Sequence, residues 1–264
     1  MIKKNVRLNP IVALLFFAFI SVLLTVLIIL ALGYRYIATD ECKFIGKTGN
    51  GQPLTGTIYY NDGRIGELDY VNNTIMYSNG DVYTGDIDQL YRHGTGKMTY
   101  SATSDTYEGD FREDKMTGQG TYTYKNGDKY VGALVDGKKE GYGEFFWADG
   151  SSYKGNFINN MKDGNGVYTW VDGSKYQGAY TKDLKDGSGT YTFSNGDVYT
   201  GAFKNDVRTG YGTYIWENGE KYEGEFLDNY IHGYGTYTWV NEDGNPTRTY
   251  EGYFEYGKIV IKDE

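Results

Sequence analysis

The chain has 264 residues, a single cysteine and a formal net charge of −9 at pH 7. Residues 1–47 hold six of the 26 basic and two of the 35 acidic residues, which leaves 20 basic and 33 acidic residues in the remainder. That acidic remainder argues against binding to nucleic acid, whose phosphates require a basic surface, and against tight adsorption to anionic lipid. The lone Cys42 excludes an internal disulfide and a zinc site built on cysteines.

An apolar run, residues 11–32, in which only Ser21 and Thr25 are polar and no residue is charged, follows a short basic segment, residues 1–10. A helix of this length extends about 33 Å, enough to cross a hydrocarbon core of about 30 Å. The run predicts a transmembrane helix or signal anchor that is retained, because a cleaved signal has a shorter apolar core; Ala31-Leu32-Gly33 nevertheless fits a cleavage site. The dense positive charge before the run predicts a single-pass protein of the cell membrane with residues 1–10 in the cytoplasm and the remainder outside.

One pattern then recurs seven times over residues 83–249: Tyr-x-Gly, with Gly-x-Gly eleven residues after the tyrosine. The seven tyrosines are Tyr83, Tyr107, Tyr130, Tyr153, Tyr176, Tyr199 and Tyr222, spaced by 24 residues once and by 23 thereafter. So regular a period is typical of stacked repeats in which each unit packs only on its neighbours.

Within each repeat, glycines and aromatic residues alternate with Thr, Lys, Glu and Asp, which is the period of a β-strand. An Asn-Gly or Asp-Gly pair, such as Asn218-Gly219, separates two such strands in most repeats and predicts a hairpin turn. Because one hairpin is barely stable alone, the hairpins must pair edge to edge. We therefore expect an all-β fold: an elongated single-layer antiparallel β-hairpin repeat solenoid of about 23 residues per repeat, preceded by one transmembrane helix.

The length of the hairpin loop decides which face the rings share. A two-residue loop would set Tyr222 opposite Ile215 and scatter the rings over both faces. A loop with an odd number of residues, such as a type I turn with a glycine bulge, places them on one face, and we expect that loop. In one such register Tyr214 would lie over Gly224, where its ring would restore buried area that glycine lacks.

The ends of the chain depart from the repeat pattern. Residues 33–52 are expected to be a linker, and residues 53–82 a degenerate N-terminal capping repeat. Residues 250–264 keep the opening motif and then form a C-terminal capping strand, in which KIVIK, residues 258–262, is expected to be an edge strand guarded by lysines.

Two segments, YEGEF at Tyr222–Phe226 and HGYGTYTW at His232–Trp239, resemble the MORN repeat (membrane occupation and recognition nexus) at its 23-residue period. The resemblance covers residues 83–239 closely and 53–254 loosely. It implies an elongated antiparallel hairpin solenoid with a role in membrane association, protein scaffolding or homodimerisation. Some members of this family carry an enzyme domain, but in this chain the repeats occupy everything after the anchor and the linker.

The sequence contains no pattern that predicts a catalytic or metal site. His93 and His232 each precede a Gly-x-Gly, where other repeats carry a basic and an acidic residue such as Lys162-Asp163, so both histidines are interpreted as parts of solvated turns. We find no set of residues for a Ser-His-Asp triad, no helix after a Gly-x-Gly to cradle phosphate and no calcium-loop spacing. We expect no enzyme activity, no cofactor and no metal.

The candidate site is a ridge of aromatic residues that lie fifteen and seventeen positions after the repeat tyrosines. The aromatic ridge consists of Tyr122, Tyr124, Phe145, Trp147, Tyr168, Trp170, Tyr191, Phe193, Tyr214, Trp216, Tyr237 and Trp239. These rings can form the hydrophobic core of a thin sheet, or an open aromatic surface that binds a partner, and the two interpretations are compatible.

We expect a membrane-tethered scaffold that presents this extended aromatic and glycine surface for protein–protein association, self-association or association with membrane lipid. The alternative is a cell-surface protein that binds carbohydrate or choline, since aromatic hairpin repeats also suit sugar stacking and cation–π cages. Paired tryptophans in every repeat would favour that alternative, and this chain has only four tryptophans in seven repeats.

Overall fold

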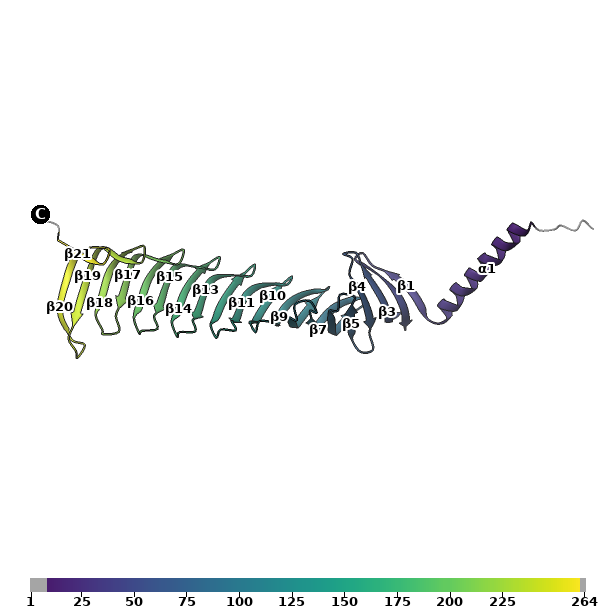
Figure 1. Ribbon diagram of the computed structural model, residues 1–264, viewed down its shortest axis with the longest axis horizontal. Coiled ribbons are helices and arrows are strands. Elements are labelled where there is room, and N and C mark those ends of the chain that lie inside the picture. Colours follow the sequence, from purple (N-terminus) through teal and green to yellow (C-terminus); the bar gives the residue numbers. More distant parts are fainter. Residues whose placement is uncertain (1–8, 262–264) are drawn as a thin grey trace, which may run out of the picture. The chain divides into compact units, whose positions relative to one another are not determined.

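The computed structural model describes residues 9–261 and shows strands throughout, preceded by one helix (Figure 1). The expected basic segment, 1–10, lies outside the described residues except for its last two positions, and so do residues 262–264 of the expected capping strand. The chain forms two compact units, Met1–Ala102 and Thr103–Glu264. Each unit is an open antiparallel sheet in which consecutive strands are paired.

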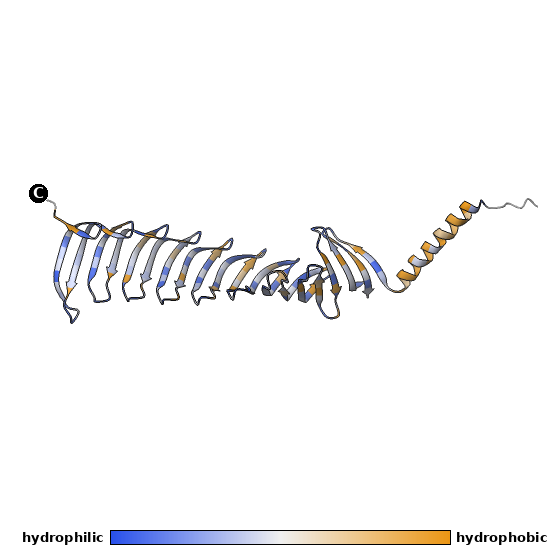
Figure 2. Ribbon diagram, viewed as in Figure 1, coloured by the Kyte–Doolittle hydropathy of each residue, from blue (hydrophilic) through white to orange (hydrophobic). Residues whose placement is uncertain are grey.

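The first unit holds the helix and seven strands. They are α1 (Pro10–Ala31), β1 (Tyr34–Ala38), β2 (Cys42–Gly49), β3 (Gln52–Tyr60), β4 (Ile65–Asp69), β5 (Thr74–Tyr77), β6 (Val82–Asp88) and β7 (Tyr91–Thr99). Helix α1 begins with Pro10 in its first turn and Asn9 as N-cap, whose side chain accepts a hydrogen bond of 3.0 Å from the Ile11 N–H. None of its residues is buried, and Figure 2 shows it as apolar over nearly its whole length.

Helix α1 is long and apolar enough to cross a membrane, and a signal sequence near the N-terminus can have the same length and composition. The expected linker that follows it, residues 33–52, is wrong, because this segment contains β1 and β2. Only Leu32 and Gly33 separate α1 from the sheet, and Cys42 and Phe44 are fully buried in it. The alternation of buried and exposed residues in β2 is an ordinary strand pattern, but it lies outside the 23-residue period and was not recognised in the sequence.

The second unit holds fourteen strands within the described residues, and they follow one another across the sheet in chain order (Figure 1). They are β8 (Thr106–Arg112), β9 (Lys115–Thr123), β10 (Lys129–Val135), β11 (Lys138–Phe146), β12 (Ser152–Ile158), β13 (Met161–Thr169), β14 (Lys175–Thr181), β15 (Leu184–Thr192), β16 (Val198–Lys204), β17 (Val207–Ile215), β18 (Lys221–Leu227), β19 (Tyr230–Val240), β20 (Pro246–Glu255) and β21 (Lys258–Val260).

The Asn-Gly loops contain an odd number of residues, as the sequence predicts. In the loop between β17 and β18, the carbonyl of Trp216 accepts a hydrogen bond from the Gly219 N–H, and the Trp216 N–H donates to Glu220, each at 2.9 Å. Three residues are therefore enclosed, and Gly219 takes the positive φ of 88° that completes a type I turn with a glycine bulge. All the ridge rings thereby lie on one face of the sheet.

The register within that face differs from the one considered above. Tyr214 lies opposite Tyr222, and Gly212 lies opposite Gly224, so tyrosine faces tyrosine and glycine faces glycine across the strands. Rings do cover these glycines, Tyr199 over Gly212 and Tyr222 over Gly224, but they belong to the Tyr-x-Gly tyrosines, each of which leans along its own strand. Sequence alternation determines which face a side chain occupies, whereas the direction in which it leans depends on its rotamer.

The repeat tyrosines form the centre of the core. Tyr199 lies over Gly201 on its own strand and over Gly212 on the next, and its hydroxyl donates a hydrogen bond of 2.9 Å to the Ala202 carbonyl. All seven repeat tyrosines are fully buried and make the same bond to the residue three positions later. The pairing register shifts directly after Gly201, the glycine of the Tyr-x-Gly motif. The tyrosine hydroxyl therefore meets the backbone at a bulge, where the ladder hydrogen bonds are interrupted.

The two glycines of each Gly-x-Gly have different functions in the fold. Gly210 has a φ of 62°, a left-handed conformation that the bulge requires and that other residues adopt at a cost. Gly212 has ordinary strand geometry, but a Cβ built on it would lie 2.7 Å from Cε2 and 2.8 Å from the hydroxyl of Tyr199. The first glycine therefore permits the backbone turn, and the second makes room for the ring.

The register predicts that Gly212→Val destabilises the chain by about 1–3 kcal/mol, because its side chain would have to displace the Tyr199 ring. Thr213→Val, on the opposite face of the same strand, should change stability by less than about 0.5 kcal/mol. Thermal melts followed by circular dichroism compare the two variants. Equal melting temperatures would contradict the packing of Tyr199 on this glycine.

Candidate functional site

The twelve residues of the aromatic ridge form one continuous row of contacting rings in the second unit. Each ring contacts the next, with eleven successive centroid distances of 4.4–5.9 Å and interplanar angles of 39–53°. In the first five repeats of the ridge the two rings come from a strand end and the loop that follows it, whereas Tyr237 and Trp239 both lie in β19. Between repeats the second ring of one pair contacts the first ring of the next. Contacts of this kind contribute about 0.5–1.5 kcal/mol each beyond the area they bury.

The ridge is only partly covered. Eleven of its residues have intermediate exposure, and Phe145, 8% exposed, is the one that is buried. The rings therefore pack on one another and are also partly exposed to solvent. Both interpretations of the ridge, as hydrophobic core and as open surface, remain compatible with this exposure.

Hydrogen bonds from the ridge tyrosines to the preceding loop fix their orientation. Tyr214 donates to Asp197 at 2.6 Å and Tyr237 donates to Glu220 at 2.7 Å. Burial, with the neighbouring carboxylate, raises the pKa of both tyrosines. Burial opposes ionisation of Asp197, but its hydrogen bonds, chiefly from Tyr214, outweigh this effect and lower the pKa of the carboxyl.

A second, deeper line of rings runs beside the ridge. Tyr199 meets Phe203 of its own repeat edge to face at 5.2 Å and Phe226 of the next repeat at 4.9 Å. The same alternation joins Tyr176 to Phe203 and Tyr222 to Phe226. This line is the core of the sheet, and from Tyr130 to Tyr222 each repeat tyrosine contacts an aromatic ring of the next repeat. After Tyr107 the corresponding residue is Leu134.

A row of four basic residues, Lys139, Lys162, Lys185 and Arg208, lies across the two lines of rings. Each cation is above a ridge ring: Lys139 over Phe145 at 4.6 Å, Lys162 over Tyr168 at 5.1 Å, Lys185 over Tyr191 at 5.3 Å and Arg208 over Tyr214 at 5.5 Å. Each also lies within 5.9 Å of rings in the deeper line. We call these residues the cation row.

The cation row was missed in the sequence, where these positions were interpreted as solvated turns. The bulge that follows the glycine of each Tyr-x-Gly, here Gly155, changes the register, so that Lys162 lies opposite Phe157 on the aromatic face. Recurrence of a basic residue at four positions, separated by three successive 23-residue intervals, is the signal that could have revealed the row. His232 is likewise only half exposed and packs edge-on against Tyr256 at 5.2 Å, so its interpretation as a solvated residue was also wrong.

Turn residues contact the whole cation row. The backbone N–H groups of Lys162 and Lys185 donate to Asp183 and Asp206, and those of Lys139 and Arg208 donate to Asn160 and Asn229. The two-residue turn after β16 has φ of 47° at Asn205 and 69° at Asp206, and the Asp206 carboxylate accepts the Lys185 N–H at 2.9 Å and lies 3.7 Å from its ammonium. Burial lowers the pKa of Lys139, Lys162 and Lys185. A shallow hollow of about 310 Å³ lies between the row and the ridge, lined by Lys162, Tyr168, Trp170, Tyr180, Asp183, Lys185 and Asp206.

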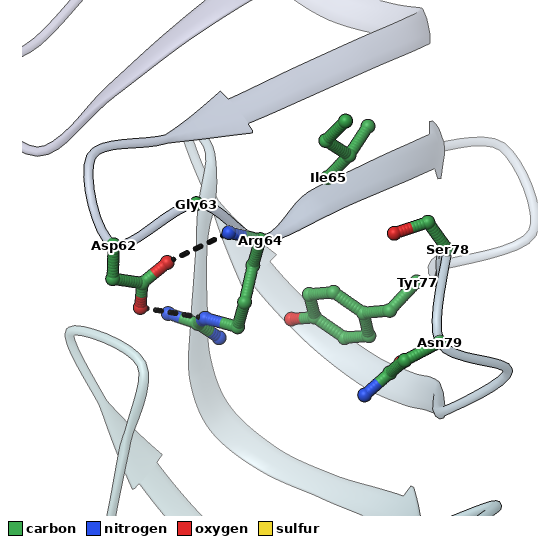
Figure 3. A pocket seen from close by; sticks show the side chains of 7 residues that line it. All are labelled: Asp62, Gly63, Arg64, Ile65, Tyr77, Ser78 and Asn79. Carbon is green, nitrogen blue, oxygen red and sulfur yellow. Dashed lines mark hydrogen bonds and ion pairs between the residues drawn. The ribbon is translucent and has the colours of Figure 1, made fainter.

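The first unit has a separate hollow beside the β3–β4 turn (Figure 3). Arg64 lies in it, 2.8 Å from Asp62 and 4.5 Å from the centre of the Tyr60 ring. Arg64 thus pairs with an acidic residue and lies over an aromatic ring of the same unit, as the residues of the cation row lie over rings in the second unit. Among residues 9–261 no group of three or more His, Cys, Asp or Glu is placed to hold a metal ion.

The fold and its repeated face define an open antiparallel hairpin-repeat protein. Six consecutive segments match the MORN repeat: residues 107–129, 130–152, 153–175, 176–198, 199–221 and 222–244. The matched segments cover more than half of the chain, and the chain belongs to the MORN-repeat family. Membership in this family indicates a repeat scaffold for protein or lipid association. Comparison with curated proteins gives no significant match.

Solved structures show weak similarity. The TCP10 domain of Danio rerio CPAP, in complex with a peptide of STIL, is 14% identical with a TM-score of 0.39, over 83% of this chain and 99% of that one. The TCP domain of Drosophila melanogaster SAS-4, in complex with a proline-rich motif of Ana2, is 16% identical with a TM-score of 0.37, over 66% of this chain and 92% of that one. At such low TM-scores these similarities carry no functional conclusion.

Alkaline titration is expected to unfold the repeats. Burial raises the pKa of Tyr130, Tyr176, Tyr199 and Tyr222 to about 12. Since an unfolded tyrosine has a pKa of about 10, this stabilisation is complete below about pH 10 and is lost as the pH rises to about 12. Circular dichroism with tyrosinate absorbance should show that the late-titrating tyrosines ionise together with loss of the sheet.

Two variants test which tyrosines are responsible. Tyr199→Phe should reduce the loss of stability per pH unit in this range, whereas Tyr211→Phe, at an exposed position on the other face, should leave it unchanged. Complete ionisation of the tyrosines near pH 10 with an intact sheet would contradict their burial.

Proposed function

We propose that the chain is a membrane-tethered scaffold whose aromatic ridge binds a protein partner along several repeats. Helix α1 is the tether, and the repeats stand outside the cell membrane. The observation that carries the proposal is the continuity of the ridge: twelve contacting rings, nearly all partly exposed, on one face. Aromatic side chains that are fixed by packing and still reach solvent are the usual anchors of protein interfaces.

Charge favours a protein partner over lipid on this face. Residues 48–264 hold 20 basic against 33 acidic residues, taken as the chain totals of 26 and 35 less the six and two of residues 1–47. A surface with this balance is repelled by anionic headgroups. The cation row is an exception within it, but Lys185 is already paired with Asp206 at 3.7 Å.

A choline-binding function gains no support from the geometry of the ridge. A quaternary ammonium would need the open face of an aromatic ring within about 6 Å. At Phe145, Tyr168, Tyr191 and Tyr214 a lysine or arginine of the chain itself already lies over the ring. These intramolecular cations occupy the position that the ligand would take, and they leave the outer edges of the rings for a larger partner.

We further propose that the chain binds without catalysing a reaction. The cation row and the ridge repeat with the period of the fold, so their residues have the same surroundings in successive repeats. A catalytic site needs different groups converging on one point, with pKa values displaced for acid and base functions.

Tyr214→Ala combined with Trp216→Ala should weaken partner binding by about 1–3 kcal/mol without abolishing it, because the remaining ring pairs of the ridge still contact the partner. The matched control is Thr213→Ala combined with Ile215→Ala, on the opposite face of the same strand. Full-length chains in nanodiscs serve as bait for quantitative mass spectrometry. The expected result is a set of proteins retained by the control and depleted by the ridge variant.

Circular dichroism must show the same sheet content in both variants, since the ridge rings also pack on each other. Equal retention of all captured proteins by the two folded variants would contradict binding at the ridge. Complete loss of binding or activity from one polar substitution, such as His93→Ala, would contradict a distributed surface.

The anchor is tested separately by membrane extraction. If α1 is retained and spans the bilayer, the full chain should stay in the membrane pellet after alkaline carbonate wash. Protease added to intact cells should then remove the repeats and leave a short membrane-bound stub. Release by carbonate would contradict the tether, and protection of the repeats until lysis would contradict the outside location.

A further inference from the structure

The outer face of the first three strands has the composition of a membrane-interface surface. Strand residues on this face include Tyr34, Tyr36, Lys43, Ile45, Lys47 and Tyr59, which we call the hairpin patch. The register places them side by side, since Tyr34 pairs with Lys47, Tyr36 with Ile45 and Lys43 with Tyr59. The patch lies outside the segments that match the MORN repeat.

The patch is exposed although much of it is apolar. Tyr36 is 62% exposed and Ile45 is 51% exposed, while the opposite face of β2 buries Cys42 and Phe44 completely. Contiguous exposed apolar residues with a polar rim mark a surface that is covered by another molecule or by a membrane.

Chain connectivity places the patch next to the end of α1. Two residues, Leu32 and Gly33, separate the helix from β1. Gly33 is tied back to the sheet, since its carbonyl accepts the Thr48 N–H at 3.0 Å. Arg35 donates to the carbonyl of Leu30 at 2.7 Å, which satisfies a group at the helix end. If α1 ends at the edge of the hydrocarbon, a rise of about 3.3 Å per strand residue would place Tyr34 within the headgroup layer of about 5–7 Å that borders it.

The charge of the patch is opposite to that of the repeats. The strand positions on this face of β1, β2 and β3 include two lysines and no acid, and Asp40 and Glu41 lie in the turn between β1 and β2. The next strand, β4, places Glu67 and Asp69 on the same face, where Glu67 accepts a hydrogen bond of 2.8 Å from Thr57, so the basic part of the face is β2. Lysine near an anionic headgroup layer contributes about 1 kcal/mol each, and tyrosine is enriched at that depth because its ring is apolar and its hydroxyl is polar.

We propose that the hairpin patch lies flat on the headgroup layer of the membrane that α1 crosses. The inference rests on the proposed anchoring by α1 and adds a second, interfacial contact to it. The patch holds the first hairpin along the bilayer surface, so the sheet leaves the membrane from a fixed base and not from a flexible linker.

Spin labels on introduced cysteines test the proposal in the full chain. The chain is reconstituted in vesicles of phosphatidylglycerol and phosphatidylcholine. Cys42 is fully buried, so the unmodified chain is the label-free control. Ala38→Cys places a label on the patch face at the end of β1 farthest from α1; Leu24→Cys reports on the helix and Thr123→Cys on solvent. Accessibility to oxygen and to a water-soluble nickel chelate gives the depth of each label.

The expected result is a position 38 label of intermediate depth, between the helix label and the solvent label. Lys43→Glu with Lys47→Glu should move it to the value of the solvent label, while the charge-preserving pair Lys43→Arg with Lys47→Arg should not. A helix label in hydrocarbon with a fully aqueous position 38 label in the unsubstituted patch would overturn the patch alone. A helix label in water would overturn the anchor, and the patch inference with it.

Discussion

The packing of the Tyr-x-Gly tyrosine on two glycines is the contact on which the rest of the sheet depends. A single-layer sheet has no second layer to cover its hydrophobic face, so it must build its core from side chains that lie down on their own strands. Tyr199 does this by covering Gly201 and Gly212 and by giving its hydroxyl to the Ala202 carbonyl. Both the small residue and the bulge are needed, because a Cβ would occupy the space of the ring and a regular ladder would leave no carbonyl for the hydroxyl.

Once the tyrosine lies flat, the other rings of the repeat are left for the surface. From Tyr130 onward the deeper line links each repeat to the next through a contact between two rings, such as that of Tyr199 with Phe226 at 4.9 Å. The ridge forms a second line at the loops, and the cation row covers the space between them. Lysine and arginine suit this position because their long aliphatic stems bury ring area while the charge stays near solvent. The sheet therefore has a packed aromatic face on which the ridge rings are still partly exposed to solvent.

Much of this fold could be predicted from the sequence, because its period makes each column visible several times. The strand pairs, the odd loop and the gathering of the rings on one face follow from alternation and from the Asn-Gly signals. The direction in which Tyr222 leans could not be predicted, since rotamers are not encoded in alternation. The position of Lys162 on the aromatic face depends on a bulge of which only Gly164, with φ of 86°, gives a hint. Strands β1 and β2 were missed because they have no copies elsewhere in the chain.

The second unit is an array in which each repeat is stabilised by its own tyrosine and by its neighbours. Hydrogen exchange on the Tyr199→Leu chain tests this most directly, because exchange resolves stability strand by strand. We expect lost protection in β16, β17 and the strands that border them, with β9–β12 keeping the protection of the unmodified chain. Uniform loss across the unit, or unchanged protection in β16 and β17, would contradict it.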